Sequence, residues 1–342
     1  MTKPETQTDS QNHFLLDNHL PEIGLQAMRE EVMEGLKDTP RCIPSKYFYD
    51  REGSALFEEI TRLPEYYLSR TEKAILSTLW NKLAIDAHNL HIIELGSGDC
   101  SKIQLLLREI PANALSTVTY HPVDISSNVL KESAGKLTQQ FPHLTVHGLV
   151  ADFMHQIHLL PHAHKRLFCF FGSTIGNFGK SEINALMERL GTLMTNGDYL
   201  LLGLDMIKEI DVLEAAYNDK QGVTERFNKN MLKVVNELLG ADFHPGLFNH
   251  RAFYNEENHR IEMHLDARED MMVTFGFNNS TIEIKAGENI HTENSHKFDR
   301  GHIRNMGEMA GLSVGHVFTD PEEWFSLVLY SKQAVPKKPG GS

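Results

Sequence analysis

Short runs of apolar residues alternate, between residues 91 and 206, with longer segments in which apolar positions recur every three or four residues. An uninterrupted apolar run predicts a buried strand, and recurrence at helical spacing predicts a helix with one buried face. Helices are therefore expected at 102–110, 128–141 and 180–194, and strands at 91–95, 117–125, 144–153, 166–172 and 198–206. Strands that alternate with helices favour a mostly parallel, doubly wound sheet.

The pattern of apolar positions changes after residue 207. Residues 208–250 have helical spacing, and a hairpin is expected around Asn255–Asn258. The remaining elements are strands expected at 271–277, 281–287 and 324–332, and a helix at 302–312.

This change of pattern predicts two domains. The sheet domain would contain residues 71–207 plus 298–335, and a smaller mixed α+β domain would contain residues 20–70 plus 208–297. The polar ends, residues 1–12 and 335–342, are expected to be disordered.

The composition narrows the class of protein. Lys and Arg total 33 and Asp and Glu total 46, so the formal net charge is −13, which disfavours nucleic acid or an anionic membrane as a partner. The three cysteines, Cys42, Cys100 and Cys169, are far apart, which fits a reducing cytoplasm. We find no signal peptide and no apolar run of membrane-spanning length. The composition is therefore that of a soluble globular protein of the cytoplasm; it leaves the oligomeric state open, with a monomer plausible.

A glycine-rich segment, Glu94–Asp99 (ELGSGD), directly follows the first expected strand of the sheet. A dinucleotide fingerprint would have a third glycine where Ser101 stands, and an acid about 20 residues further on. Here the next acid at a strand end, Asp124, lies 28 residues after Gly96, which disfavours an NAD-dependent oxidoreductase. S-adenosylmethionine (SAM) carries no pyrophosphate and needs only close backbone approach and a carboxylate for its ribose.

The acids at the next two strand ends fit SAM. Asp124 is placed to accept hydrogen bonds from the ribose hydroxyls. Asp152 can accept from the adenine amine while Phe153 packs on the ring, and Lys102 can pair with the methionine carboxylate. These residues together favour SAM as the cofactor.

Several long blocks closely resemble one family, the bacterial L-histidine Nα-methyltransferases: Pro44–Glu72, ELGSGDCSK, GSTIGNF, AAYNDKQGVTERFNKN, RIEMHLDAR and TENSHKF. Members of this family make hercynine, the first intermediate of ergothioneine biosynthesis. The resemblance implies a class I SAM-dependent methyltransferase, which is an α/β fold with a Rossmann-like doubly wound sheet and a smaller mixed α+β substrate-binding domain. It also implies that the α-amino group of histidine is trimethylated.

The resemblance also implies which residues form the site. The family's SAM contacts fall on Gly96, Lys102, Asp124, Asp152 and Phe153. Its histidine contacts fall on Tyr66, Asn177, Tyr217, Glu293 and Ser295, and Met263 matches a position that shapes the side-chain pocket.

The segment Gly172–Phe178 (GSTIGNF) would be a binding edge beside the SAM methyl group. We expect Gly172 and Gly176 to permit close approach, and Asn177 and the Tyr217 hydroxyl to hold the substrate carboxylate. No general base is evident, so the catalytic residue is unknown, and Gly172, Asn177 and Tyr217 are expected to act by positioning.

The contacts to the side chain of the substrate would decide which amino acid is bound. Glu293 and Ser295 would bind the two imidazole nitrogens and would face the same way if their segment is extended. Asn294 stands between them, where the family usually has an apolar residue. A related N-methyltransferase acting on another aromatic amino acid or amine, such as a tryptophan derivative, remains the alternative function, with a non-catalytic SAM-binding module as a third.

Four histidines, His155, His158, His162 and His164, have a spacing that a metal site could use. No carboxylate or cysteine lies among them and a proline interrupts the segment, so a solvated loop is favoured. We therefore expect no metal cofactor.

Overall fold

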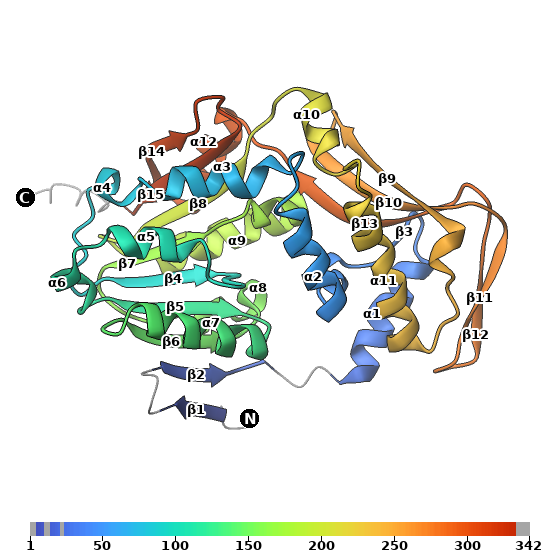
Figure 1. Cartoon of the computed structure of the whole chain (residues 1–342), viewed down its shortest axis with the longest axis horizontal. Coiled ribbons are helices and arrows are strands. Elements are labelled where there is room, and N and C mark those ends of the chain that lie inside the picture. Colours follow the sequence, from blue (N-terminus) through green and yellow to red (C-terminus); the bar gives the residue numbers. More distant parts are fainter. Residues whose placement is uncertain (1–4, 10–13, 21–23, 333–342) are drawn as a thin grey trace, which may run out of the picture.

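The computed structural model describes residues 5–9, 14–20 and 24–332. A nine-stranded sheet and a four-stranded sheet lie side by side (Figure 1). The nine-stranded sheet has the order β1-β2-β6-β5-β4-β7-β8-β15-β14. Its strands are β1 (Glu5–Asp9), β2 (Phe14–Asn18), β4 (His91–Leu95), β5 (Thr119–Asp124), β6 (Thr145–Val150), β7 (Arg166–Phe170), β8 (Tyr199–Asp205), β14 (Ser313–Thr319) and β15 (Phe325–Ser331).

The strand order β6-β5-β4-β7-β8 is that of a doubly wound sheet, with the chain reversing its direction of winding after β6. All neighbouring pairs from β2 to β8 are parallel, whereas β15 is antiparallel to both β8 and β14. The five strands expected between residues 91 and 206 are all present. The predicted α/β fold class is therefore confirmed.

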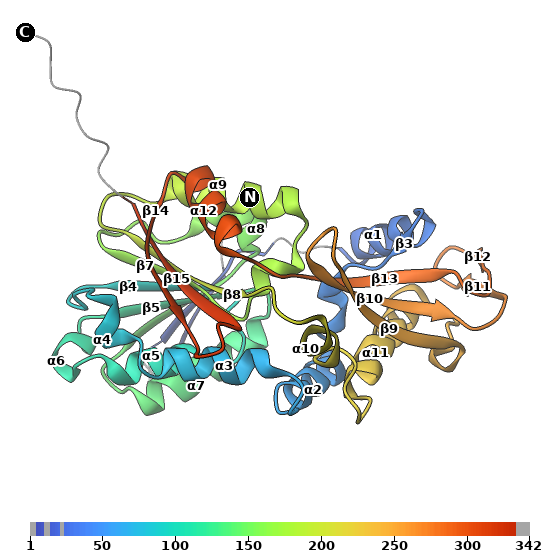
Figure 2. The ribbon, with the colours of Figure 1, turned by 90° about the horizontal axis from the view of Figure 1, so that it is seen from above.

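Helices cover both faces of this sheet, and each face has its own hydrophobic core (Figure 2). One core involves α3 (Tyr67–Leu76), α4 (Trp80–Leu83), α5 (Ile103–Glu109), α6 (Ala112–Leu115) and α7 (Ser127–Gln140). The other involves α8 (Phe153–Gln156), α9 (Lys180–Leu193), α12 (Arg300–Ala310) and the 3-10 turn η2 (Ile157–Leu159).

The N-terminal segment differs from the expectation. Residues 5–9, within the segment for which disorder is expected, form β1 and pair antiparallel with β2, and β2 continues the sheet beside β6. Backbone hydrogen bonds along a sheet edge do not require an apolar pattern, which is why the polar sequence gave no sign of β1. The other expected tail, residues 335–342, and residues 1–4 and 10–12 lie outside the described residues.

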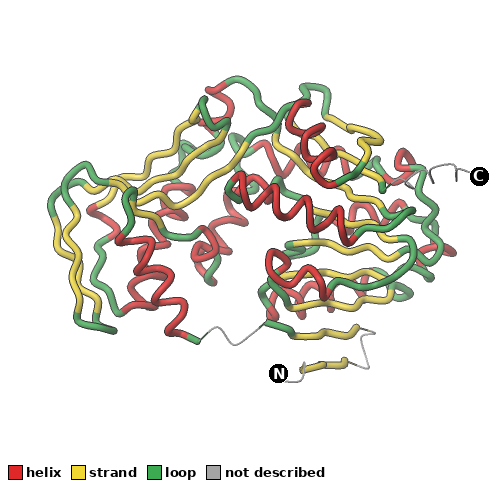
Figure 3. The backbone as a smooth tube through the Cα atoms, turned by 180° about the vertical axis from the view of Figure 1, so that it is seen from behind, coloured by secondary structure: helices red, strands yellow, loops and turns green. Residues whose placement is uncertain are grey.

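The smaller part of the structure is built on the sheet β3-β13-β10-β9, with a hairpin, β11-β12, beyond it (Figure 3). Its helices are α1 (Leu25–Lys37), α2 (Arg51–Ile60), α10 (Ile210–Ala215) and α11 (Val223–Leu239), and its 3-10 turns are η1 (Ser45–Phe48) and η4 (Pro245–Leu247). Its strands are β3 (Arg41–Cys42), β9 (Phe248–Asn255), β10 (Arg260–Ala267), β11 (Met271–Phe275), β12 (Ser280–Ile284) and β13 (Asn289–His296).

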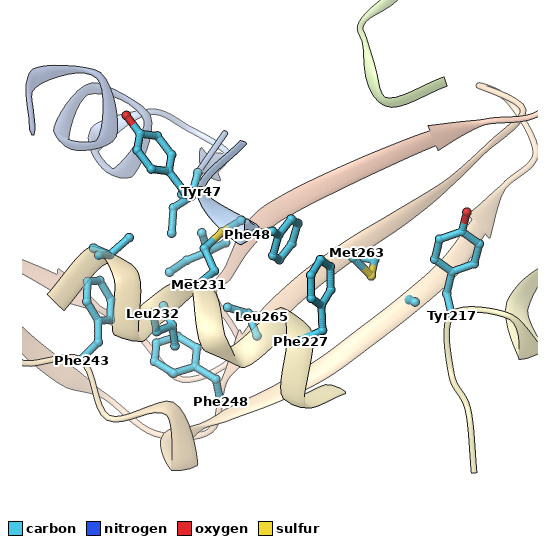
Figure 4. Close-up of a cluster of buried hydrophobic side chains, with 14 of the residues drawn as sticks. Tyr47, Phe48, Tyr217, Phe227, Met231, Leu232, Phe243, Phe248, Met263 and Leu265 are labelled. Carbon is cyan, nitrogen blue, oxygen red and sulfur yellow. The ribbon is translucent and has the colours of Figure 1, made fainter. Parts of the chain in front are cut away.

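Helix α11 contributes many of the side chains that form the hydrophobic core of this smaller part. Its buried side chains, including Phe227 and Met231, pack against Met263 and Leu265 of β10 (Figure 4). The helical region expected at 208–250 is two helices, α10 and α11, and it ends at Leu239, because Gly222 and Gly240, at the two ends of α11, have left-handed φ values of 67° and 59°. The expectation is wrong for residues 248–250, which begin strand β9. The division of the chain at residues 71, 207 and 298 stays a prediction.

Candidate active site

The glycine loop after β4 is tied to the end of β5. Gly96 and Gly98 have φ values of 61° and 51°, a region that favours glycine. The Asp124 carboxylate accepts hydrogen bonds from the backbone N–H groups of Gly98 and Ser126, each at 3.0 Å. Burial raises the pKa of Asp124 above its ordinary value. A carboxylate has about four lone-pair positions, so two remain for ligand hydroxyl groups.

The residues expected at the adenine end lie beside the same loop. Phe153 is edge-on to Phe170, with ring centroids 5.3 Å apart, and its ring lies 3.7 Å from the position of a Cβ at Gly96. Asp152 caps the short helix α8 by accepting from the Met154 N–H at 2.9 Å. Because Gly96, Asp124 and Asp152 follow three adjacent parallel strands, all of them lie at the carboxyl edge of the sheet, where ligands of open α/β sheets bind.

A buried acid that the sequence analysis missed joins two loops of this edge. Glu72, in α3, is fully buried; its Oε2 lies 2.8 Å from the Lys102 ammonium, and its Oε1 accepts from the Gly172 N–H at 2.7 Å. Gly172 has a φ of 80°, a backbone conformation that favours glycine, and a Cβ there would lie 2.7 Å from Lys102 Nζ and would displace it. The signal for Glu72 was its position on the apolar face of α3, between Leu68 and Ile75.

At the junction of the two sheets, the candidate substrate residues form a buried network. The Tyr217 hydroxyl donates to Ser295 Oγ at 2.8 Å, and the Lys297 ammonium donates to Ser295 Oγ at 2.8 Å and to the Tyr217 hydroxyl at 3.1 Å. Lys297, which the sequence analysis also missed, is paired with Asp205 at 2.7 Å. The network therefore connects β13 with the end of β8.

Asp205 is the anionic centre of this network. Besides Lys297, it accepts from the Tyr67 hydroxyl at 2.8 Å and from Lys208 at 2.6 Å. Burial raises the pKa of Asp205, but the two nearby ammonium groups outweigh this effect and hold that pKa below its ordinary value. Asp205 is therefore ionised at neutral pH.

Strand β13 presents Glu293 and Ser295 on one face. In the register of the sheet, Glu293 lies opposite Met263 and Ser295 opposite Ile261, and the side chains of Met263 and Ile261 are buried in the core. Burial raises the pKa of Glu293 to about 7, although the Lys297 ammonium opposes this shift. The segment is therefore extended as expected, and both side chains face the same way.

Asn294 lies on the opposite face of β13. It pairs with Glu262, and its Oδ1 lies 3.0 Å from Nε2 of His291. The departure from the family pattern at Asn294 therefore falls outside the face that carries Glu293 and Ser295.

Two tyrosines of the block Pro44–Glu72 lie near the candidate substrate residues. Tyr66 is buried and edge-on to Tyr217, with ring centroids 6.2 Å apart. Burial, with the nearby Tyr217 and Glu293, raises the pKa of Tyr66 well above its ordinary value. Tyr49, which the sequence analysis did not single out although it lies in the resembling block Pro44–Glu72, is 47% exposed and edge-on to Phe227, with ring centroids 6.0 Å apart.

Asn177 is the last residue of η3 (Thr174–Asn177), which packs against β13. A Cβ at Gly176 would lie 2.9 Å from the backbone oxygen of His296, so this glycine permits the close approach. Asn177 is thereby brought to the strand that carries Ser295. The described partners of the Tyr217 hydroxyl are Ser295 and Lys297, and none of its described hydrogen bonds joins it to Asn177.

The four histidines at 155, 158, 162 and 164 are all exposed, as expected, but only His162 and His164 lie in a loop, because His155 is in α8 and His158 is in η2. His155 Nδ1 lies 2.7 Å from the Asp152 carboxylate. Within the described residues, no helix is long and apolar enough to cross a membrane.

The doubly wound sheet, the glycine loop and the carboxylates at adjacent strand ends define a SAM-dependent methyltransferase. Residues 28–332 match the family model described as histidine-specific, SAM-dependent methyltransferase, and the chain belongs to this family. When bound, SAM would supply an electrophilic methyl group on its sulfonium, and the Asp124 carboxylate suits its ribose hydroxyls. The assignment of Asp152 and Phe153 to the adenine and of Lys102 to the methionine carboxylate stays a prediction, and Lys102 is paired with Glu72 in the structure.

Three curated relatives are similar along most of the chain. The histidine N-alpha-methyltransferase of Mycolicibacterium smegmatis is 38% identical over 304 residues, which cover 89% of this chain and 94% of that protein. The protein of the same name from Mycobacterium tuberculosis is 37% identical over 316 residues, covering 92% and 98%. Ergothioneine biosynthesis protein 1 of Neurospora crassa is 29% identical over 321 residues, covering 88% of this chain and 36% of that protein.

Replacing Asp124 with Ala is expected to weaken SAM binding by about 1–3 kcal/mol, because hydroxyl groups of the ribose would lose an acceptor. Calorimetric titration with SAM measures the change. Asp99→Ala, which removes an exposed acid from the same loop, is the matched control and should bind SAM as the unmodified chain does. Unchanged SAM binding in a folded Asp124→Ala variant would place the ribose elsewhere.

Proposed function

We propose that this enzyme transfers methyl groups from SAM to the α-amino group of L-histidine, and that it forms the trimethylated product hercynine, the first step of ergothioneine biosynthesis. The family and the names of the mycobacterial and Neurospora relatives support the reaction. The observation that carries the proposal is the hydrogen-bonding state of Ser295 beside Glu293.

Ser295 Oγ accepts from both Tyr217 and Lys297. A serine hydroxyl has two lone pairs and one hydrogen, so these two contacts leave the hydrogen free to donate to a ligand. Glu293, on the same face, offers a carboxylate that accepts. A neutral imidazole has one N–H and one lone pair, and therefore satisfies both groups at once.

An indole ring does not match this pair of groups. It has an N–H for Glu293 but no acceptor for the Ser295 hydroxyl, and a phenyl ring satisfies neither. A polar group that is buried without a partner costs about 1–3 kcal/mol, so the pocket favours histidine over tryptophan or its derivatives.

Methyl transfer itself requires a neutral amine held in line with the reacting carbon. A free α-amine has a pKa of about 8, so the enzyme binds or produces the minor neutral form near neutral pH. We assign the positioning of the substrate to Asn177 and Tyr217 at its carboxylate, with Gly172 leaving room for the amine. The Tyr217 hydroxyl has one hydrogen, so it would turn from Ser295 to the carboxylate when histidine binds, and Ser295 would still accept from Lys297 and donate to the imidazole. Orientation of this kind supplies up to about 7–11 kcal/mol, so no strong general base is required.

Histamine tests the carboxylate contacts, because it keeps the imidazole and the amine but lacks the carboxylate. Charge-assisted hydrogen bonds contribute about 1.5–3 kcal/mol each, so kcat/KM for histamine should be roughly 100-fold or more below that for histidine. Steady-state rates with both compounds at saturating SAM give the comparison. Equal turnover of the two compounds would show that Asn177 and Tyr217 do not bind the substrate carboxylate.

A further inference from the structure

The four-stranded sheet has a second polar cluster, on the face opposite Glu293 and Ser295. Along β10, Ile261, Met263 and Leu265 belong to the hydrophobic core that contains α11, and Figure 4 shows Met263 and Leu265 beside that helix. Glu262 and His264, which alternate with them, therefore lie on the other face. The register places His264 opposite His291 and Met263 opposite Glu293. This shift of register is a β-bulge at Thr292.

The bulge brings together three residues that bind metals in proteins. Glu262, His264 and His291 each offer one ligand atom, and these three atoms all lie within 4.8 Å of one another. Ligand atoms around a tetrahedral zinc ion lie roughly 3.3 Å apart, so small side-chain rotations would close the set. We propose that Glu262, His264 and His291 bind a zinc-class divalent cation on this face of the sheet.

The hydrogen bonds of His264 point to a cation. Its Nδ1 lies 3.0 Å from Asn289 Oδ1, and its Nε2 lies 3.0 Å from Glu262 Oε2. Both partners are acceptors, whereas a neutral imidazole has one N–H to donate. If Nδ1 donates to Asn289, Nε2 directs a lone pair at the carboxylate, and a cation between these two atoms makes both of them ligands.

Neighbouring asparagine side chains orient the two histidines, as is usual around a bound metal ion. Asn289 orients His264 through the nitrogen that does not face Glu262, and Asn294 Oδ1 lies 3.0 Å from His291 Nε2. Such outer contacts orient metal-binding histidines. Phe253 stacks on His264, with ring centroids 5.5 Å apart.

The charge of the cluster selects the class of cation. Arg260 and Asn255 donate to Glu262 Oε1 at 2.7 and 2.9 Å, which leaves Oε2 for the site and offsets much of the carboxylate charge. Ca²⁺ and Mg²⁺ need several charged or neutral oxygen ligands, which this set lacks. Two imidazoles and one carboxylate suit Zn²⁺ or Co²⁺, with water completing the coordination.

The cation would stabilise the strand that carries the candidate specificity residues. Thr292 lies between His291, on the metal face, and Glu293, on the pocket face. A cation bound to both β10 and β13 on one face of the sheet would therefore stabilise the bulge, and the bulge places Glu293 on the opposite face. Because the cation would bind the folded chain and not the unfolded chain, the unfolding temperature should rise as the cation concentration rises.

The test uses the whole chain, purified without a histidine tag and treated with chelator. Calorimetric titration with Zn²⁺ should give one tight site per chain, and Co²⁺ should give the visible absorption of a low-symmetry site. His264→Gln and His291→Asn should each raise the Zn²⁺ dissociation constant by about 100-fold, and Asn289→Ala, which keeps all three ligands, by about 10-fold. His155→Ala, in α8, and His158→Ala, in η2, replace exposed histidines; they are matched controls and should leave binding unchanged.

Stoichiometric Zn²⁺ binding that is lost in His264→Gln and His291→Asn but kept in the His155 and His158 controls supports the proposal. The absence of a stoichiometric site overturns it, as does a site that survives His264→Gln and His291→Asn. Loss of Zn²⁺ binding in the His155 or His158 control also overturns the proposal, because that result would assign the cation to residues 155–158. If His264→Gln fails to fold, His291→Asn and Asn289→Ala decide by the same criteria.

Discussion

Replacing Glu293 with Ala is expected to lower kcat/KM for histidine by roughly 10- to 150-fold, the equivalent of a hydrogen bond to a charged group worth about 1.5–3 kcal/mol. The imidazole N–H would lose its acceptor. An apolar ring would also no longer have to desolvate the half-buried carboxylate, so discrimination against tryptophan should relax. Steady-state rates for histidine, tryptophan and phenylalanine, with the unmodified chain and the variant, measure both effects.

The matched control for this substitution is Asn294→Ala, one residue away on the opposite face of β13. It should leave the preference for histidine unchanged, and both variants should bind SAM as the unmodified chain does. If Glu293→Ala leaves the ratio of histidine to tryptophan turnover unchanged, Glu293 is not the specificity residue. The proposed imidazole contact would then be wrong.

Replacing Asp205 with Ala is expected to lower the free energy of unfolding by about 3–5 kcal/mol, the usual result of removing one partner from a buried ion pair. The side chains of Lys297 and Lys208 are almost fully buried, at 0% and 3% exposure, and would lose their common counter-charge. The substitution also removes an acceptor for the Tyr67 hydroxyl. Urea unfolding, with the midpoint and slope fitted separately, measures the change.

A double variant separates the charge from the packing. Asp205→Ala combined with Lys297→Met removes one unpaired ammonium and replaces it with an apolar side chain of similar length. It should be more stable than Asp205→Ala alone, because a buried unpaired charge is less favourable than an apolar group. A single Asp205→Ala variant that unfolds within about 0.5 kcal/mol of the unmodified chain, the range typical of surface substitutions, would show that this network does not stabilise the fold.

Much of the large sheet could be predicted because its central strands are buried on both faces. The runs HIIEL and RLFCFF become β4 and β7, whose residues are almost all buried. Strand β14 was missed because most of its side chains are exposed or half-buried, so its sequence lacks the apolar contrast of a core strand. The N-terminal strand β1 was missed for a related reason, since the sequence ETQTD has no apolar alternation.

The candidate site shows a similar limit. The sequence indicated Asp124, Glu293 and Ser295 because each lies at a strand end or in a block that resembles the family. It did not single out Glu72 or Lys297, although both lie in resembling blocks, because their oppositely charged partners, Lys102 and Asp205, lie 30 or more residues away in the sequence. Pairs of this kind arise only from the tertiary packing of buried charges, and no local pattern marks them.

The β-bulge at Thr292 is a further feature that no sequence pattern marked. Strict alternation would place His291, Glu293 and Ser295 on one face of β13. The extra residue moves His291 to the opposite face and leaves Glu293 and Ser295 together. The same local irregularity thus separates the candidate imidazole contacts from the proposed cation site.

The most direct test of the central claim is the mass of the product. The purified chain is incubated with SAM and an equimolar mixture of histidine, tryptophan and phenylalanine, and the amino acids are analysed by mass spectrometry with fragmentation. The account predicts a histidine product heavier by three methyl groups, all on the α-nitrogen, with tryptophan and phenylalanine unchanged. Methylation of tryptophan in preference to histidine, or methyl groups on the imidazole ring, would contradict it.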